Sequence, residues 1–147
     1  MLSVPSLLTL THLIGLALAV GSATSKLMLL LKCRADSAFL PTYVAAAKTI
    51  TRLIVVGLGL LTLSGVGWLL TGYPFSLLLI VKLVLVGSIW MLGPIIDNVI
   101  EPRFQKLAPG AGDAPSPEFI RIQGRYVLLE LVATGLFYVI IVIWMLL

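Results

Sequence analysis

Hydrophobic residues in this chain form four long runs, separated by shorter stretches that are richer in charged and turn-forming residues. The runs cover about residues 5–31, 41–71, 75–107 and 125–147. Each run reaches the ~20 residues that an α-helix needs to cross a bilayer. The pattern therefore predicts an all-α fold, a transmembrane four-helix bundle that forms one integral membrane domain over residues 1–147.

The third run contains features that interrupt its apolar character. Pro94 lies inside it and predicts a kink, because a proline in a helix interior removes one backbone hydrogen bond. Residues 95–107 then mix apolar and charged side chains, which is typical of a short amphipathic extension along the membrane surface. We expect Asp97 and Glu101, four residues apart, to lie on the solvated face of this extension.

Composition narrows the class of protein further. Hydrophobic residues make up 60% of the chain, charged residues only 11%, and the mean hydropathy is +1.15. Soluble domains are nearer half apolar and a quarter charged. The formal net charge of +4 comes mainly from basic residues that flank the apolar runs, so it indicates a lipid bilayer as the partner and no nucleic acid.

The basic residues are distributed asymmetrically along the chain. Eight of them follow the first and third runs or flank those connections: Lys32, Arg34, Lys48, Arg52, Arg103, Lys106, Arg121 and Arg125. The N-terminal stretch, the turn at residues 71–74 and the C-terminus hold none. Because Lys and Arg stay on the cytoplasmic side, both termini are expected on the non-cytoplasmic side of a bacterial-type inner (plasma) membrane. Trp68, Tyr73 and Trp144 then form an aromatic belt at the outer interface.

One face of the first apolar run combines small residues with the only histidine of the chain. At about 100° per residue, His12, Gly15, Ala19, Ala23 and Lys26 lie within roughly a quarter-turn of one another. Small residues allow helix backbones to approach closely. We therefore expect this face to be a packing seam against neighbouring helices.

His12 and Lys82 are expected at the same depth in the membrane. Each lies about seven residues from the outer end of its helix, which is roughly 10 Å at the rise of an α-helix. One interpretation is structural, with a hydrogen-bonded core histidine and a lysine that snorkels to the surface. The other is a shared polar pocket, because polar groups inside a membrane are costly and tend to be functional.

A second polar layer is expected near the inner surface. Lys26 lies near the inner end of the first helix, and Glu130 lies near the start of the fourth. A buried charge is usually paired. We expect a structural ion pair between Lys26 and Glu130 that fixes the register of the two helices.

Several kinds of chemistry are excluded by the residues that are present. One histidine and one cysteine, at opposite ends of the first run, cannot build a tetrahedral zinc site. The acidic residues are expected at the surface opposite to His12, so no Ser/His/Asp triad has a candidate and no catalytic residue is assigned. Neutral imidazole is, however, a good axial ligand for haem iron. Lys82 could pair with a porphyrin propionate or act as a second ligand.

Two stretches resemble a known group of membrane proteins. They are THLIGLALAVGSATSK from Thr11 and LLLIVKLVLVG from Leu77. They are similar to copper-resistance protein D and HemJ-like small membrane proteins, helical bundles with an early His, a Gly about nine residues later and a K-L-x-L-V run. Here those positions are His12, Gly21 and residues 82–86. HemJ is a haem-binding protoporphyrinogen oxidase, so the resemblance implies a tetrapyrrole site, although a later histidine of that family has no counterpart here.

Two functional hypotheses from different classes follow. In the first, His12 and Lys82 line a site in the outer half of the bundle that binds haem or another tetrapyrrole in a redox role, with His12 as the iron ligand. In the second, the protein is a non-catalytic accessory subunit that packs against a larger membrane complex. Its partners would then be other membrane subunits or a second copy in a homodimer. Whether the protein is an enzyme stays open in both hypotheses.

Overall fold

The computed structural model describes residues 3–110 and 112–146, and this part of the chain contains helices and no strand. Four helical segments are long and apolar enough to cross a membrane, as in a multi-pass membrane protein. The elements in chain order are α1 (Val4–Ala35), η1 (Ser37–Phe39), α2 (Leu40–Leu70), α3 (Leu77–Ile95), η2 (Ile96–Ile100), α4 (Glu101–Lys106) and α5 (Pro117–Leu146). The all-helical fold with four potential membrane spans is as predicted.

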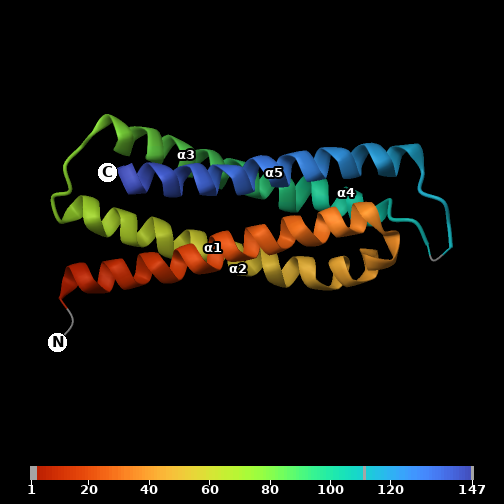
Figure 1. Cartoon of the computed structure of the whole chain (residues 1–147), viewed down its shortest axis with the longest axis horizontal. Coiled ribbons are helices and arrows are strands. Elements are labelled where there is room, and N and C mark those ends of the chain that lie inside the picture. Colours follow the sequence, from red (N-terminus) through yellow and green to blue (C-terminus); the bar gives the residue numbers. More distant parts are fainter. Residues whose placement is uncertain (1–2, 111, 147) are drawn as a thin grey trace.

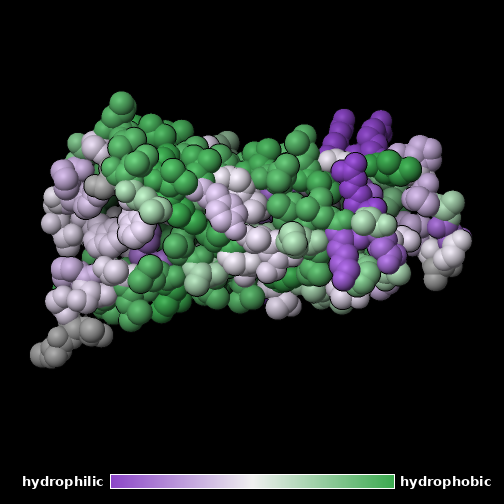
Figure 2. All heavy atoms as spheres, viewed as in Figure 1, coloured by the Kyte–Doolittle hydropathy of each residue, from purple (hydrophilic) through white to green (hydrophobic). Residues whose placement is uncertain are grey.

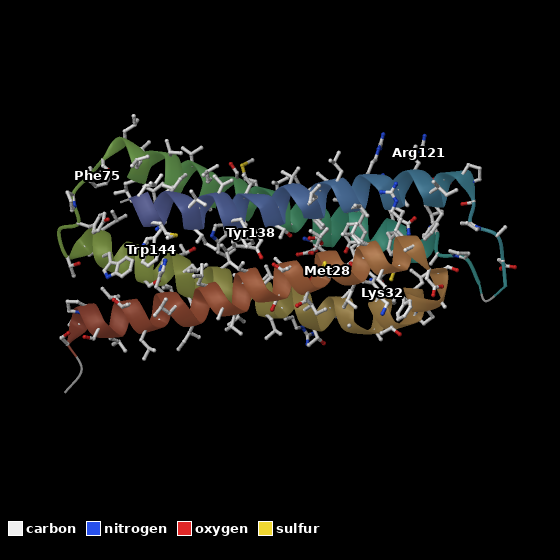
Figure 3. The ribbon with its side chains drawn as sticks, in the orientation of Figure 1. Met28, Lys32, Phe75, Arg121, Tyr138 and Trp144 are labelled. Atoms are coloured by element: carbon white, nitrogen blue, oxygen red, sulfur yellow. The ribbon has the colours of Figure 1, made fainter. Side chains whose placement is uncertain are left out.

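The helices form an elongated bundle with two chemically different ends (Figure 1). The start of α1, the α2–α3 connection and the end of α5 lie at one end, here called the terminal end. The α1–α2 and α4–α5 connections lie at the other end, where strongly hydrophilic side chains gather beyond a broad apolar middle (Figure 2). Lys32 and Arg121 both lie toward this second end, which we call the basic end (Figure 3).

Helices α1 and α2 pack closely because small residues line their contact. Gly15, Ala19 and Ala23 are all buried on α1. A Cβ atom added to Gly57 of α2 would lie only 2.4 Å from the backbone nitrogen of Ala19. One added to Gly15 would lie 2.8 Å from the carbonyl oxygen of Gly57. The expected packing seam on α1 is therefore confirmed, and its partner is α2.

The core near the basic end is built around aromatic side chains. The ring of Phe104 lies between those of Phe119 and Tyr126, with ring centroids 5.2 and 5.3 Å away. Tyr43 meets both Phe104 and Tyr126 edge-on. Such pairs contribute roughly 0.5–1.5 kcal/mol each beyond the burial of their area. This cluster fixes α2, α4 and α5 against one another.

Residues 96–106 do not form the surface extension that the sequence suggested. They continue α3 through one π-helical stretch, in which the N–H of Glu101 bonds to the carbonyl of Ile96, and then through α4. Pro102, which lacks an N–H, fits the first turn of α4. Phe104 is fully buried and Glu101 is only 7% exposed, because this segment packs into the bundle core. The expected solvated position is therefore wrong for Glu101, and Asp97 is only partly exposed, at 25%.

Several helix boundaries also differ from the expected ones. The last helix begins at Pro117, about two turns before the expected residue 125, and the Ser116 hydroxyl accepts a hydrogen bond from the Phe119 N–H. A serine cap followed by proline is a strong start signal. The third helix begins at Leu77 rather than 75, capped by Ser76, and the first continues to Ala35 rather than ending at 31.

Candidate functional site

A cavity of about 280 Å³ lies between α1, α2, α3 and α5 in the terminal half of the bundle. Its lining is dominated by leucine, isoleucine, valine and aromatic side chains. His12 and Lys82, which the sequence placed at one depth, both line it. We call this space the terminal cavity. An apolar space with a few polar groups is the usual form of a small-molecule site.

The His12 ring is oriented by a hydrogen bond to α2. Its Nδ1 atom lies 2.8 Å from the hydroxyl oxygen of Ser64, which is 1% exposed. The Ser64 hydroxyl donates its own hydrogen to the Leu60 carbonyl, 2.8 Å away. Ser64 must therefore accept from His12, so Nδ1 carries the ring hydrogen and Nε2 keeps a free lone pair. This is the arrangement in which a histidine binds a metal through Nε2 or accepts a proton there.

Aromatic side chains complete the wall beside His12. The Trp68 ring lies with its centroid 5.0 Å from that of His12 and is tilted by 35°. Tyr73 and Trp144 also line the terminal cavity. Figure 3 shows Trp144 near the terminal end, on the side of α5 that faces α2. These residues, expected only as an interfacial belt, are therefore also part of the cavity wall.

Lys82 of α3 brings a positive charge to the terminal cavity. Its side chain is half-buried, and the cavity lining contains no carboxylate. Within the described residues, no carboxylate lies within salt-bridge distance of its ammonium group. Among the described residues, the cavity thus has a cation without a counter-ion and an imidazole in the same lining.

A second polar cluster, here called the lysine centre, lies nearer the basic end. The Lys26 side chain is 1% exposed, and its Nζ atom lies 3.0 Å from Asp97 Oδ1, 2.9 Å from Glu101 Oε2 and 2.9 Å from Glu130 Oε1. The sequence predicts a contact of Lys26 with Glu130 alone. Asp97 and Glu101, which are predicted to be solvated, also contact the Lys26 ammonium.

Further side chains bind the carboxylates of the lysine centre. Tyr126 donates to Glu101 Oε2 at 2.7 Å, and its hydroxyl also bonds to that of Tyr43. Gln105 donates to Glu101 Oε1 at 3.2 Å. The Lys26 ammonium lies 5.7 Å from the centroid of the Tyr126 ring, within the range of a cation–π interaction. The centre thereby joins α1, α2, α4 and α5 at one point.

Residue spacing in the sequence gives weak indications of both sites. Ser64 and Trp68 are four residues apart on α2, and therefore share the face that meets His12. Ile96, Ile100 and Phe104 repeat at the same spacing, which marks a buried helix face beside Asp97 and Glu101.

In the described parts of the chain, no group of three His, Cys, Asp or Glu side chains is arranged to hold a metal ion.

Comparisons with known protein families, curated proteins and solved structures found no match for this chain. The resemblance to copper-resistance protein D and HemJ-like proteins therefore stays a prediction. Functional inference rests on the geometry of the two polar sites.

Proposed function

We propose that the terminal cavity binds a lipid-soluble molecule with an acidic group, and that this ligand is haem or a related tetrapyrrole with a redox role. The observation that carries the proposal is that the His12 imidazole, held by Ser64, and the Lys82 ammonium, which has no carboxylate partner among the described residues, line one apolar cavity.

The residues present fit the donor set of such a ligand. Ligating histidines almost always donate their other ring N–H to a fixed acceptor, as His12 does to Ser64. Lys82 is a counter-ion for a propionate, and the aromatic and aliphatic wall suits a macrocycle. Bound haem would supply one-electron redox chemistry.

The size of the terminal cavity sets a condition on the ligand. Ligand sites commonly measure ~300–1,000 Å³, and the 280 Å³ here is at the lower limit. A tetrapyrrole would therefore extend beyond the cavity between the helices. Because the chain has one histidine, a second axial ligand would come from Lys82 or from a second copy of the chain.

We further propose that the terminal end faces the non-cytoplasmic side of a bacterial-type inner membrane. Strongly hydrophilic side chains gather at the opposite end (Figure 2). In the described chain, Lys82 is the only Lys or Arg in the helix segments of the terminal half. The positive-inside rule supports this orientation. The terminal cavity then opens in the outer half of the bilayer.

The test is a visible spectrum of the protein purified in lipid nanodiscs, before and after titration with hemin. A Soret band that is lost in His12→Ala supports the proposal. Ser64→Ala should weaken binding by about 10–100-fold, as is typical for removal of the hydrogen-bond partner of a ligating histidine. Lys82→Met should weaken binding too, whereas Lys32→Met, at the exposed basic end, serves as its matched control and should not.

Two results would contradict this function. One is a wild-type spectrum without a Soret band even at saturating hemin. The other is a Soret band that is unchanged in His12→Ala. A colourless protein that co-purifies with larger membrane proteins would favour the alternative, a non-catalytic accessory subunit whose apolar faces pack against a complex.

A further inference from the structure

The lysine centre contains more acid than base. Three carboxyl groups, those of Asp97, Glu101 and Glu130, surround the single ammonium of Lys26 at 2.9–3.0 Å. In the described part of the chain, no other basic side chain lies within salt-bridge distance of them. With every group ionised the centre would carry two uncompensated negative charges inside the membrane, and buried charge without a partner is costly.

The three carboxyl groups differ in how well they are satisfied as anions. Glu101 accepts hydrogen bonds from Tyr126 and Gln105 in addition to its contact with Lys26. Asp97 accepts from Lys26 and is 25% exposed. Glu130 is only 4% exposed. Its Oε1 atom is close to Lys26 but has no hydrogen bond of acceptable geometry.

A second unpartnered group lies beside Glu130. The Thr134 hydroxyl is one turn further along α5, in a side chain that is 4% exposed, and it has no hydrogen-bond partner. Residues four apart on a helix share a face and are neighbours. Buried polar atoms are nearly always bonded. The Glu130 oxygen therefore lacks a donated hydrogen, and the neighbouring Thr134 hydroxyl lacks a hydrogen-bond partner.

We propose that the lysine centre is a proton-binding site, in which the Glu130 carboxyl holds one proton in addition to the charge carried by Lys26. The Glu130 carboxylate takes the proton from water at the basic end and becomes a neutral carboxylic acid. The charge of the centre changes from −2 to −1. Asp97, the partly exposed member, is the group nearest to solvent through which the proton is exchanged.

The groups that face Glu130 come from every element around it. They are Lys26 of α1, Tyr43 of α2, Asp97 of η2, Glu101 of α4 and Tyr126 of α5. Lys26 alone stabilises the ionised form of Glu130, and it is shared with two other carboxylates. The site is independent of the terminal cavity and of any ligand bound there.

Infrared spectroscopy of the wild-type protein in nanodiscs at neutral pH tests the proposal. A protonated carboxylic acid has a carbonyl stretch that a carboxylate lacks. This band should be present, should shift in D₂O, and should shift again when glutamate is labelled with ¹³C. The isotope experiment needs no variant, so it is valid even if substitutions at this centre impair folding.

Two variants locate the proton. Glu130→Gln imitates the neutral acid, so it should remove the band and leave the thermal midpoint near that of the wild type. Glu101→Gln is the matched control, which should retain the band and lower the midpoint. The proposal is overturned if the wild-type protein lacks the band, which is the result expected if a monovalent cation is bound in place of the proton. It is also overturned if the band persists in Glu130→Gln.

Discussion

Removal of the Lys26 ammonium is the most direct test of what holds the bundle together. In Lys26→Met the apolar stem is kept, but Asp97, Glu101 and Glu130 lose their shared cation at 2.9–3.0 Å. Breaking a buried ion pair by removing one partner costs about 3–5 kcal/mol. We expect a loss of that size at neutral pH, because the three carboxyl groups lose their shared cation in a site that is largely closed to water.

The free energy of unfolding can be measured by titration with SDS in mixed micelles. At acidic pH the difference between Lys26→Met and the wild type should shrink, because protonation of the carboxylates removes the uncompensated charge. Lys48→Met removes an exposed lysine of the same length and should change stability by less than about 0.5 kcal/mol. If Lys26→Met were no more destabilising than Lys48→Met, the lysine centre would not be a stabilising element and the reasoning would fail.

Three further predictions address the packing, the tyrosine pair and the topology. Gly57→Ala should destabilise the bundle by about 1–3 kcal/mol in the same assay, because its new methyl group would meet the α1 backbone, whereas Gly59→Ala adds its methyl in open space and should not. Tyr126→Phe should lower the free energy of unfolding by about 1.5–3 kcal/mol, because Tyr126 donates a hydrogen bond to the Glu101 carboxyl group. Tyr43→Phe should lower it by only about 0.5–1.5 kcal/mol, because Tyr43 bonds to the Tyr126 hydroxyl. Equal losses would contradict the role of Tyr126 as the donor to Glu101. Alkaline phosphatase fused to the C-terminus should be active and a fused green fluorescent protein dark, and the reverse pattern would refute the orientation.

The membrane-spanning elements were predictable because a single physical requirement determines them. A segment that crosses hydrocarbon must satisfy its backbone internally and expose apolar side chains, and both conditions are visible as run length and composition. The packing seam on α1 was predictable for a similar reason, since small residues at helical spacing allow a neighbouring helix backbone to approach closely. Gly15, Ala19 and Ala23 are accordingly buried.

The membership of the lysine centre could not be predicted in the same way. Asp97 and Glu101 are followed by Pro102 and Arg103, and this local composition is that of a surface segment. Only the tertiary arrangement brings the π-helical stretch against α1 and places these acids around Lys26. The hydrogen-bond partner of His12 could not be predicted for another reason. Ser64 is a single hydroxyl in an apolar helix, and the register of α2 against α1 is set by the contact of Gly15 with Gly57.

The two polar sites divide the bundle into halves with different physical roles. Lys26 follows His12 by fourteen residues, about 21 Å along α1, and an apolar layer that includes Ala19, Ile89 and Phe137 lies between them. At the basic end, a charged network and an aromatic cluster fix α1, α2, α4 and α5 together. At the terminal end the space between the helices stays open as a cavity. The packing of the basic half is continued into the terminal half by the close contact of α1 and α2 at Gly15 and Gly57, so the terminal cavity lies beside a tightly packed helix pair.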